Sequence, residues 1–154
     1  MAGTLHPRDS LIKAALTPAQ CVGMTVWAES RAEPIEGQVA VACVIRNRLL
    51  LPKRFDDTWK EVCLAKWQFS CWIPQGGEAN YQMLMTRCDA AMRGQHTWPA
   101  QAMWIAEGII SNALLDRVSG ATHYFASWMP KPPKWAEGID PVAVIGVHRF
   151  YKGV

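Results

Sequence analysis

Three glutamates, Glu29, Glu33 and Glu36, lie close together in the stretch TVWAESRAEPIEGQ. A carboxyl group that acts as a catalytic acid must hold its proton at neutral pH. Burial against apolar or aromatic groups favours this, because the charged form then loses its hydration. Trp27 precedes the three carboxylates and Pro34 interrupts them. The first question is whether one of these glutamates is a general acid or all three belong to a solvated helix junction.

The helix expected before this junction favours Glu29 as the acid. Thr17 is a good N-cap and Pro18 suits the first helical position, so a helix should begin here and end near residues 30–31. Glu29 then falls in the last turn, where the negative end of the helix dipole disfavours a second negative charge. Trp27 and the aromatic residues further along the chain could supply the wall that removes water from it.

Glu33 and Glu36 have good structural explanations instead. They come at the start of a second expected helix, over residues 34–50, where a carboxylate is stabilised as an ordinary first-turn charge. This helix is apolar on nearly all sides, which is typical of a buried central helix. The residues alone therefore favour Glu29 over Glu33 and Glu36, and they leave open that none of the three is catalytic.

The remaining segments predict a mainly helical fold with a small β element near the C-terminus. Apolar stripes at helical spacing predict two more helices, over 80–93 and 99–117. Residues 51–79 show no clear period and are rich in aromatic residues, Pro and Gly, which is typical of a binding loop, with room for a short helix over 57–65. The segments THYFA and VAVIGVHRFY are β-branched and aromatic, so they are expected to form short strands.

Length and composition indicate a globular chain. The 154 residues fit an N-terminal arm over 1–16 followed by a single domain over 17–154, and we expect a monomer. Half of the residues are hydrophobic and 19% are charged, which excludes a disordered chain. The net charge of +3 is too small to argue for a nucleic-acid partner, and none is expected. We find no apolar run typical of a signal peptide or a membrane helix, so no stable membrane insertion is expected.

The five cysteines do not predict a disulfide framework. Cys21, Cys43 and Cys88 fall on apolar helix faces and are expected to be small buried hydrophobic residues. Cys63 and Cys71 lie in the loop-like region and could approach each other. The odd number argues against complete pairing, and without a C-x-x-C pair no structural zinc site is expected.

One long stretch resembles a known family. WAESRAEPIEGQVAVACVIRNRL is similar to the signature of the SleB/CwlJ-type cell-wall hydrolases, the spore-cortex-lytic enzyme family. QFSCW at 68–72 and the terminal HYFA and IGVHRFY resemble later parts of the pattern, in the same order. The resemblance covers residues 17–151. It departs at Ala32, where the family usually has Gly, and Ala tolerates a left-handed turn less well.

The resemblance implies a lysozyme-like, lytic-transglycosylase-like α+β domain that cleaves the glycan strand of peptidoglycan without a metal or other cofactor. In such enzymes a Glu-Ser pair ends a helix, and it corresponds here to Glu29 and Ser30, with Tyr124 as the residue that assists them. The substrate-binding residues implied by the resemblance are Glu33, Gln68, Phe69, Ser70, Trp72, His123 and Tyr151.

A single acid is enough for a lytic transglycosylase. Glu29 would protonate the oxygen between N-acetylmuramic acid and N-acetylglucosamine, and an oxocarbenium-like centre would develop at C1. The acetamido group of the sugar could stabilise this centre, and the ionised Glu29 could take the proton of the 6-hydroxyl to close a 1,6-anhydro ring. If water attacks instead, the enzyme is a muramidase, and Asp56, Asp57 and Glu61 stay open as the second carboxylate.

Two alternatives belong to other classes. A metal-dependent amidase or peptidase would need His123 and His148 to hold zinc, but the sequence has no HExxH motif. A non-catalytic module that binds the wall or nucleic acid would use the Trp and basic residues of WMPKPPKW and LPKRF, but these basic residues are scattered rather than forming one stripe.

The expected setting follows from the lack of an export signal and of a separate wall-binding domain. Both features are typical of a phage or prophage endolysin. Such a protein would gather in the cytoplasm of the host bacterium, and it would then reach the periplasm and cell wall when the membrane opens. Peptidoglycan is the expected partner.

Overall fold

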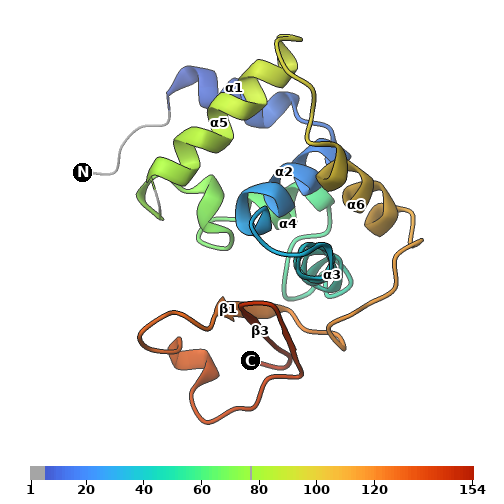
Figure 1. The fold of residues 1–154 in the computed structure, drawn as a ribbon, viewed down its shortest axis with the longest axis vertical. Helices are drawn as coiled ribbons and strands as arrows, with labels where there is room; N and C mark the ends of the chain where they lie inside the picture. Colours follow the sequence, from blue (N-terminus) through green and yellow to red (C-terminus); the bar gives the residue numbers. More distant parts are fainter. Residues whose placement is uncertain (1–5, 77) are drawn as a thin grey trace.

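The structure is a computed structural model that describes residues 6–76 and 78–154. It confirms a mainly helical fold with a small β element near the C-terminus, and Figure 1 shows the helices above the sheet. The elements in chain order are α1 (Pro7–Ala15), α2 (Pro18–Ser30), α3 (Ile35–Leu49), α4 (Trp59–Leu64), η1 (Ser70–Trp72), η2 (Pro74–Gly76), α5 (Glu78–Met92), α6 (Ala100–Ile110), β1 (His123–Ala126), η3 (Lys134–Ala136), β2 (Ala143–Ile145) and β3 (His148–Tyr151).

Helix α2 lies at the centre and packs against α3, α4, α5 and α6. Its start is the predicted capping box, in which the Thr17 hydroxyl accepts the Gln20 amide at 3.1 Å and the Gln20 side chain accepts the Thr17 amide at 2.9 Å. Its end at Ser30, with Arg31 as C-cap, is also as predicted. Glu29 therefore lies in the last turn of a helix that the core surrounds.

Helix α3 is the predicted buried helix, and its polar C-terminal end is buried too. Arg46 donates to the carbonyl of Leu114 at 2.6 Å, and Asn47 donates to the carbonyl of Ala121 at 3.0 Å. These bonds supply donors for backbone carbonyls in a segment that has no regular structure of its own. The end of α3 thereby fixes the connection that leads from α6 to the sheet.

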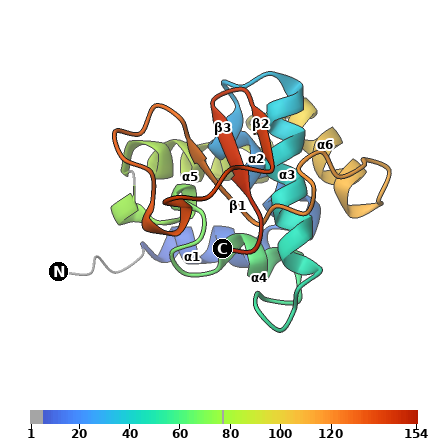
Figure 2. The same cartoon turned by 90° about the horizontal axis from the view of Figure 1, so that it is seen from below.

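The sheet has the strand order β1-β3-β2, and both pairs are antiparallel. In Figure 2 the three strands lie beside α3, which β2 contacts. The predicted strand segment VAVIGVHRFY is divided into β2 and β3, because the chain reverses at Gly146 with φ 58°. A Cβ at Gly146 would come within 2.6 Å of Oε1 of Glu33, so glycine is required here by both the backbone and its neighbour.

The helix predicted over 99–117 is too long. Helix α6 ends at Ile110, and Asn112 adopts φ 62°, a left-handed conformation that the short polar side chain of Asn tolerates. The Leu114 amide then donates back to the Gly108 carbonyl at 3.0 Å. Ala113, which continued the apolar stripe in the sequence, is exposed. The apolar pattern predicted too long a helix because the turn after Ile110 places Ala113 and Leu114 at the same spacing as the helical stripe.

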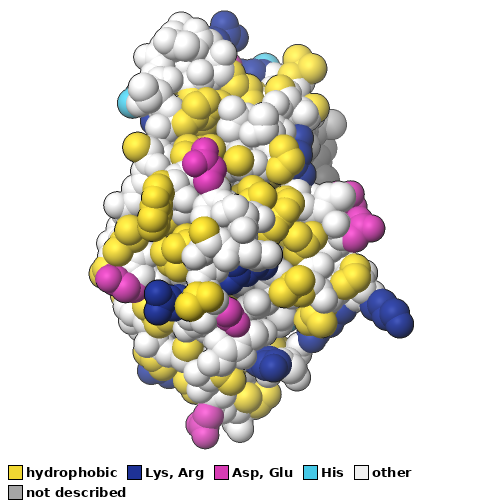
Figure 3. All heavy atoms as spheres, turned by 90° about the vertical axis from the view of Figure 1, so that its right-hand side faces the viewer, with side chains coloured by type: hydrophobic (Ala, Val, Ile, Leu, Met, Phe, Trp, Pro, Cys, Tyr) yellow, Lys and Arg dark blue, Asp and Glu magenta, His cyan; other side chains and the backbone are white. Residues whose placement is uncertain are grey.

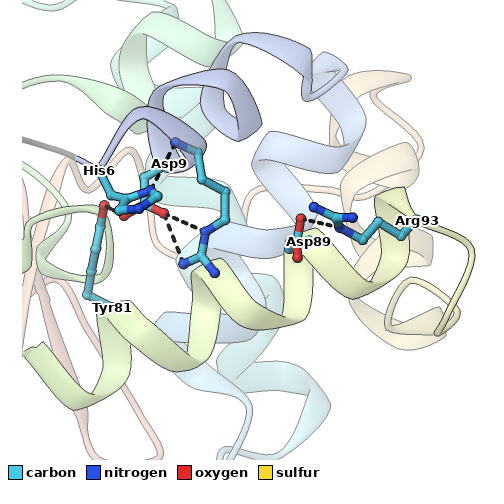
Figure 4. Close-up of polar contacts among 6 residues, drawn as sticks. His6, Asp9, Tyr81, Asp89 and Arg93 are labelled. Atoms are coloured by element: carbon cyan, nitrogen blue, oxygen red, sulfur yellow. Dashed lines mark hydrogen bonds and ion pairs between the residues drawn. The ribbon is translucent and has the colours of Figure 1, made fainter.

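The segment expected as an N-terminal arm contains a helix. Residues 1–5 lie outside the described residues, but α1 is a helix of nine residues that packs on α5. Asp9 is 3% exposed and accepts a hydrogen bond from the Tyr81 hydroxyl of α5 at 2.8 Å, with Arg8 at 3.1 Å on its other oxygen (Figure 4). Ile12 and Leu16 join the hydrophobic core.

No helix within residues 6–76 and 78–154 is long and apolar enough to cross a membrane. The face that carries α6 shows several separate hydrophobic patches between charged side chains (Figure 3).

All five cysteines are buried and free, which confirms the expectation for Cys21, Cys43 and Cys88 and shows Cys63 and Cys71 as thiols.

The contact between Asp9 and Tyr81 gives a first prediction. Tyr81→Phe removes one donor from a buried carboxylate, and we expect the free energy of unfolding to fall by about 1–3 kcal/mol. Urea denaturation followed by circular dichroism measures it. Ser10→Ala, on the exposed side of α1, is the control and should change stability by less than about 0.5 kcal/mol. A Tyr81→Phe protein as stable as the wild type would show that this bond does not hold α1 in place.

Candidate active site

The Glu29 carboxylate is the point at which three segments of the chain meet. It projects from the last turn of α2. Its Oε1 accepts the backbone N–H of Cys71, in η1, at 3.2 Å. Its Oε2 accepts the hydroxyl of Tyr124, in β1, at 3.1 Å. A half-buried carboxyl group is thus held in one orientation by a donor on each oxygen.

Tyr124 is a neutral donor. Burial raises its pKa well above the usual value, and the nearby charge of Glu29 adds to the rise. Its ring packs against Phe150, with ring centroids 5.6 Å apart, and edge-on against His148 at 4.8 Å. The hydroxyl therefore keeps its proton at neutral pH and donates a hydrogen bond to Glu29.

The amide of Cys71 is held in place by the residue after it. The Trp72 indole N–H donates to the Thr25 hydroxyl of α2 at 2.8 Å, and Lys13 of α1 donates to the Trp72 carbonyl at 3.2 Å. Trp72 is 4% exposed. The structure therefore places this predicted sugar-binding tryptophan in the core, where it fixes η1. Burial also raises the pKa of the Cys71 thiol well above its usual value, with a further contribution from Glu29.

Arg48 is a residue near the candidate site that the sequence analysis did not single out. Its Nε donates to the Thr122 carbonyl at 2.8 Å and its Nη1 to the Gln68 side chain at 3.0 Å. The guanidinium lies over the rings of Phe69, at 4.8 Å, and Phe55, at 5.3 Å. Gln68 is exposed and Phe69 is buried, and Arg48 ties both to the start of β1. A charged residue at the end of an otherwise apolar helix was the available signal.

A groove of about 490 Å³ opens beside Glu29. Arg31 and Asn80 line it from the helices, joined by a hydrogen bond of 2.9 Å. Trp128 and His148 line it from the sheet side. The predicted acid therefore lies at the edge of a cavity that a ligand can enter.

Glu33 lines the same groove and holds the β2–β3 turn. Its Oε1 accepts the Val147 amide at 2.8 Å and lies 3.7 Å from Nδ1 of His148. The side chains of His148 and Glu33 are 8% and 12% exposed. Burial lowers the pKa of His148, against an opposing effect of Glu33 and Glu29, so this imidazole is neutral at neutral pH. Nδ1 of His148 is buried and has no hydrogen-bond partner among the described residues.

The two serines predicted for the site differ in position. Ser30 lines the groove, but its hydroxyl is buried and donates to the Val26 carbonyl at 2.7 Å. The structure therefore does not join that hydroxyl to the Glu29 carboxylate. Ser70 is exposed at the start of η1, one residue before the amide that binds Glu29.

Tyr151 and His123 lie at the far end of the sheet from the groove. They face each other in the register of β1 and β3, whereas His148 pairs with Ala126 at the other end. Tyr151 is buried in a second small cluster, stacked on Phe125 at 5.6 Å. His123 lies 5.1 Å from the Trp135 ring.

The other carboxylates that the sequence left open as partners of Glu29 do not line the groove beside it. Within residues 6–76 and 78–154, no three His, Cys, Asp or Glu side chains come together as a metal site would require. Asp56 and Glu61 line a different groove, and Glu61 bonds to Thr58 at the start of α4. Asp57 does not line the groove beside Glu29 either. Among the described residues, the groove that Glu29 lines contains one other carboxylate, that of Glu33.

A family model described as Cell Wall Hydrolase matches residues 32–151. The chain belongs to the Cell Wall Hydrolase family. The catalytic domain of SleB from Bacillus cereus is 28% identical, with a TM-score of 0.62 over 88% of this chain and 89% of that chain. The catalytic domain of the germination-specific lytic transglycosylase SleB from Bacillus anthracis is 25% identical, with a TM-score of 0.60 over 99% and 100%. No curated protein matches the sequence.

These similarities confirm the family resemblance and the lysozyme-like fold class expected from the sequence. The family match begins at Ala32, just after Glu29, so it does not itself include the proposed acid. The similarity to the Bacillus anthracis domain spans nearly all of this cell-wall hydrolase and therefore extends over α2.

The environment of His123 predicts that the free energy of unfolding of this cell-wall hydrolase depends on pH. Burial, aided by Arg48 and Arg54, lowers the pKa of His123 to about 4. An unfolded His titrates near pH 6.5, so between about pH 6.5 and 4 the unfolded chain binds a proton that the native state does not. Stability contributed by neutral His123 is therefore lost as pH falls through this range.

An NMR titration of the imidazole protons tests this. The signal that disappears in His123→Gln should titrate with a midpoint near pH 4. The urea midpoint of the wild type should also fall more steeply than that of His123→Gln between about pH 6.5 and 4. A midpoint near pH 6.5 would contradict the burial of this ring.

Proposed function

We propose that this cell-wall hydrolase cleaves the glycan strand of peptidoglycan between N-acetylmuramic acid and N-acetylglucosamine, with Glu29 as general acid. The observation that carries the proposal is a carboxyl group at a helix end, held by one amide and one neutral tyrosine at the edge of a groove. The similar Bacillus anthracis protein, described as a lytic transglycosylase, supports the same type of bond. The endolysin setting, the host location and the monomeric state stay predictions from the sequence.

The first step needs the proton of Glu29. Glu29 gives it to the glycosidic oxygen, the bond from C1 of N-acetylmuramic acid to that oxygen breaks, and positive charge develops at C1. Glu29 becomes a carboxylate in the same step. The Cys71 amide and the Tyr124 hydroxyl donate to its two oxygens, and such bonds strengthen as the acceptor gains charge. The two donors therefore stabilise the transition state more than the starting state.

The second step differs between a lytic transglycosylase and a hydrolytic muramidase. In a lytic transglycosylase the 6-hydroxyl oxygen of the muramic sugar attacks C1, its proton passes to Glu29, and a 1,6-anhydro ring forms. We favour this route because it needs no second carboxylate and returns Glu29 to its starting state. Glu33 supports the alternative, a hydrolytic muramidase, because it lines the same groove and could activate a water molecule.

Replacement of the acid is the main test. Glu29→Gln keeps the shape of the side chain but removes its exchangeable acid proton. We expect the release of soluble fragments from purified peptidoglycan to fall by about 100- to 10,000-fold. Glu36→Gln, at an exposed position in the first turn of α3, is the matched control and should keep full activity.

Mass spectrometry of the fragments identifies the reaction. Fragments that end in 1,6-anhydro-muramic acid would support the lytic transglycosylase. Reducing muramic ends would support the muramidase and make Glu33 the second carboxylate to test. Free stem peptides with an intact glycan strand would overturn the proposal in favour of an amidase.

Tyr124→Phe tests the proposed donor. It removes the hydroxyl that donates to Glu29 but keeps the buried ring. Because a hydrogen bond to a developing charge is lost, we expect kcat to fall by about 10- to 100-fold with little change in KM. Steady-state kinetics on soluble glycan fragments measure both constants, and circular dichroism checks the fold. An unchanged kcat would remove Tyr124 from the mechanism.

A further inference from the structure

A second groove, which Glu29 does not line, is formed by α1, α4 and the segment 65–75. It consists of two cavities, of about 470 and 230 Å³, that share Lys13, Leu64 and Ala65. The Lys60 ammonium of α4 donates to the Ala14 carbonyl of α1 at 3.1 Å and so joins the two helices. The steps proposed for Glu29 use none of these residues. The groove is therefore free to bind a second part of the substrate.

Trp67 is exposed at the smaller cavity although its backbone is strained. Its φ is 64°, in the left-handed region that a bulky residue rarely adopts, and the Gln68 amide closes the turn by donating to the Ala65 carbonyl at 3.2 Å. Trp67 is 64% exposed, so burial of the ring does little to offset this strain. Strained residues are found mainly at binding and catalytic sites. The position of Trp67 therefore indicates a ligand with an apolar surface.

Three lysines give the groove positive charge that the protein does not neutralise by direct contact. Lys13 and Lys60 each donate to one backbone carbonyl, that of Trp72 at 3.2 Å and that of Ala14 at 3.1 Å. An ammonium group has three N–H donors, so each lysine keeps two for a ligand. Across residues 6–76 and 78–154, no ion pair joins Lys13, Lys60 or Lys66 to a carboxylate. Burial lowers the pKa of Lys13, and an anion beside this ammonium would offset its lost hydration.

The charges differ between the two cavities. The larger one is lined by the carboxylates of Asp56 and Glu61 together with Lys60. The smaller one is lined by Lys13 and Lys66, and by no carboxylate among the described residues. A simple anion would meet the two acids, and a simple cation would meet the lysines. The ligand that fits has a carboxylate at one end and, at the other, an amine beside a second carboxylate.

We propose that this groove binds the stem peptide of peptidoglycan and selects diaminopimelate as its third residue. Diaminopimelate ends in an amine and a carboxylate on one carbon. The amine pairs with Asp56 and Glu61, and the carboxylate pairs with Lys60. The α-carboxylate of the γ-linked D-glutamate before it pairs with Lys66, and the methylene groups of that residue lie on Trp67. This inference rests on the proposed function only in that the peptidoglycan substrate supplies the peptide.

Two soluble tripeptides test the selectivity. N-acetyl-L-Ala-γ-D-Glu-meso-diaminopimelate carries the terminal amine and carboxylate, whereas N-acetyl-L-Ala-γ-D-Glu-L-Lys carries the amine alone. In isothermal titration calorimetry with the full-length wild type, the diaminopimelate peptide should bind about ten-fold more tightly, because the other peptide leaves Lys60 without a carboxylate. Equal affinities, or no binding of either peptide, would overturn the proposal. Neither peptide has a glycosidic bond, so turnover does not interfere.

Charge variants test the two contacts at the larger cavity. Lys60→Met should weaken the diaminopimelate peptide alone and reduce its preference to about two-fold, whereas Asp56→Asn should weaken both peptides by about five-fold, since both carry the amine. Asp57→Asn is the matched control, because Asp57 is exposed beside Asp56 but lines neither cavity. Circular dichroism checks that each variant is folded. A folded Lys60→Met protein that keeps the full preference would contradict the assigned contact.

Replacement of Trp67 tests the apolar contact. Trp67→Ala should weaken both tripeptides alike, by about five-fold, because the D-glutamate methylene groups are common to both. Trp104→Ala is the control: Trp104 is 57% exposed but lies on α6 and lines a different groove, so affinity should not change. Unchanged affinity in Trp67→Ala would remove the ring from the site.

The outcomes separate this inference from the proposed function. Glycan cleavage by a wild type that binds neither tripeptide would overturn the peptide site and leave the proposed reaction in place. The predicted preference between the tripeptides, in a wild type that releases no glycan fragments, would support the peptide site and overturn the proposed reaction.

Discussion

The two hydrogen bonds to Glu29 join parts of the molecule that are far apart in the chain. One donor is 42 residues away, in η1, and the other is 95 residues away, in β1. A carboxyl group held on both oxygens keeps its orientation only while α2, η1 and β1 keep their relative positions. Because small displacements of the proposed acid would be costly in rate, much of the surrounding structure can be understood as support for these two contacts.

The support comes from buried polar groups rather than from apolar packing alone. Trp72 ties η1 to Thr25 of α2, and Arg48 ties the Gln68 side chain to the residue before β1. A buried guanidinium is costly unless its N–H groups find acceptors, and here they bond to a backbone carbonyl and a side-chain amide. The bond to Thr122 also satisfies a backbone carbonyl at the end of a segment without regular structure. Arg48 therefore fixes the sheet on the helices while its own burial is compensated.

Local signals in the sequence were enough for part of this arrangement. The capping box at Thr17 and the change of pattern near Ser30 gave the bounds of α2, and with them the place of Glu29 at a helix end. Contacts between distant residues left no such signal. The amide of Cys71, the role of Arg48 and the burial of Trp72 depend on which segments pack together. An aromatic residue near a site has the same sequence pattern whether it lines a groove, as Trp128 does, or supports a turn, as Trp72 does.

The groups in contact with Glu29 suit the roles proposed for this carboxyl group, first as acid and then as base. Burial raises the pKa of Tyr124 and of the Cys71 thiol and lowers the pKa of His148, so all three groups are neutral at neutral pH. A lysine or arginine in direct contact would favour the ionised carboxyl group so strongly that it would hold no proton to donate. An amide and a phenol stabilise the carboxylate by hydrogen bonding alone. These two donors suit the proposed reaction, in which Glu29 gives its proton to the glycosidic oxygen and then receives one from the 6-hydroxyl of the sugar.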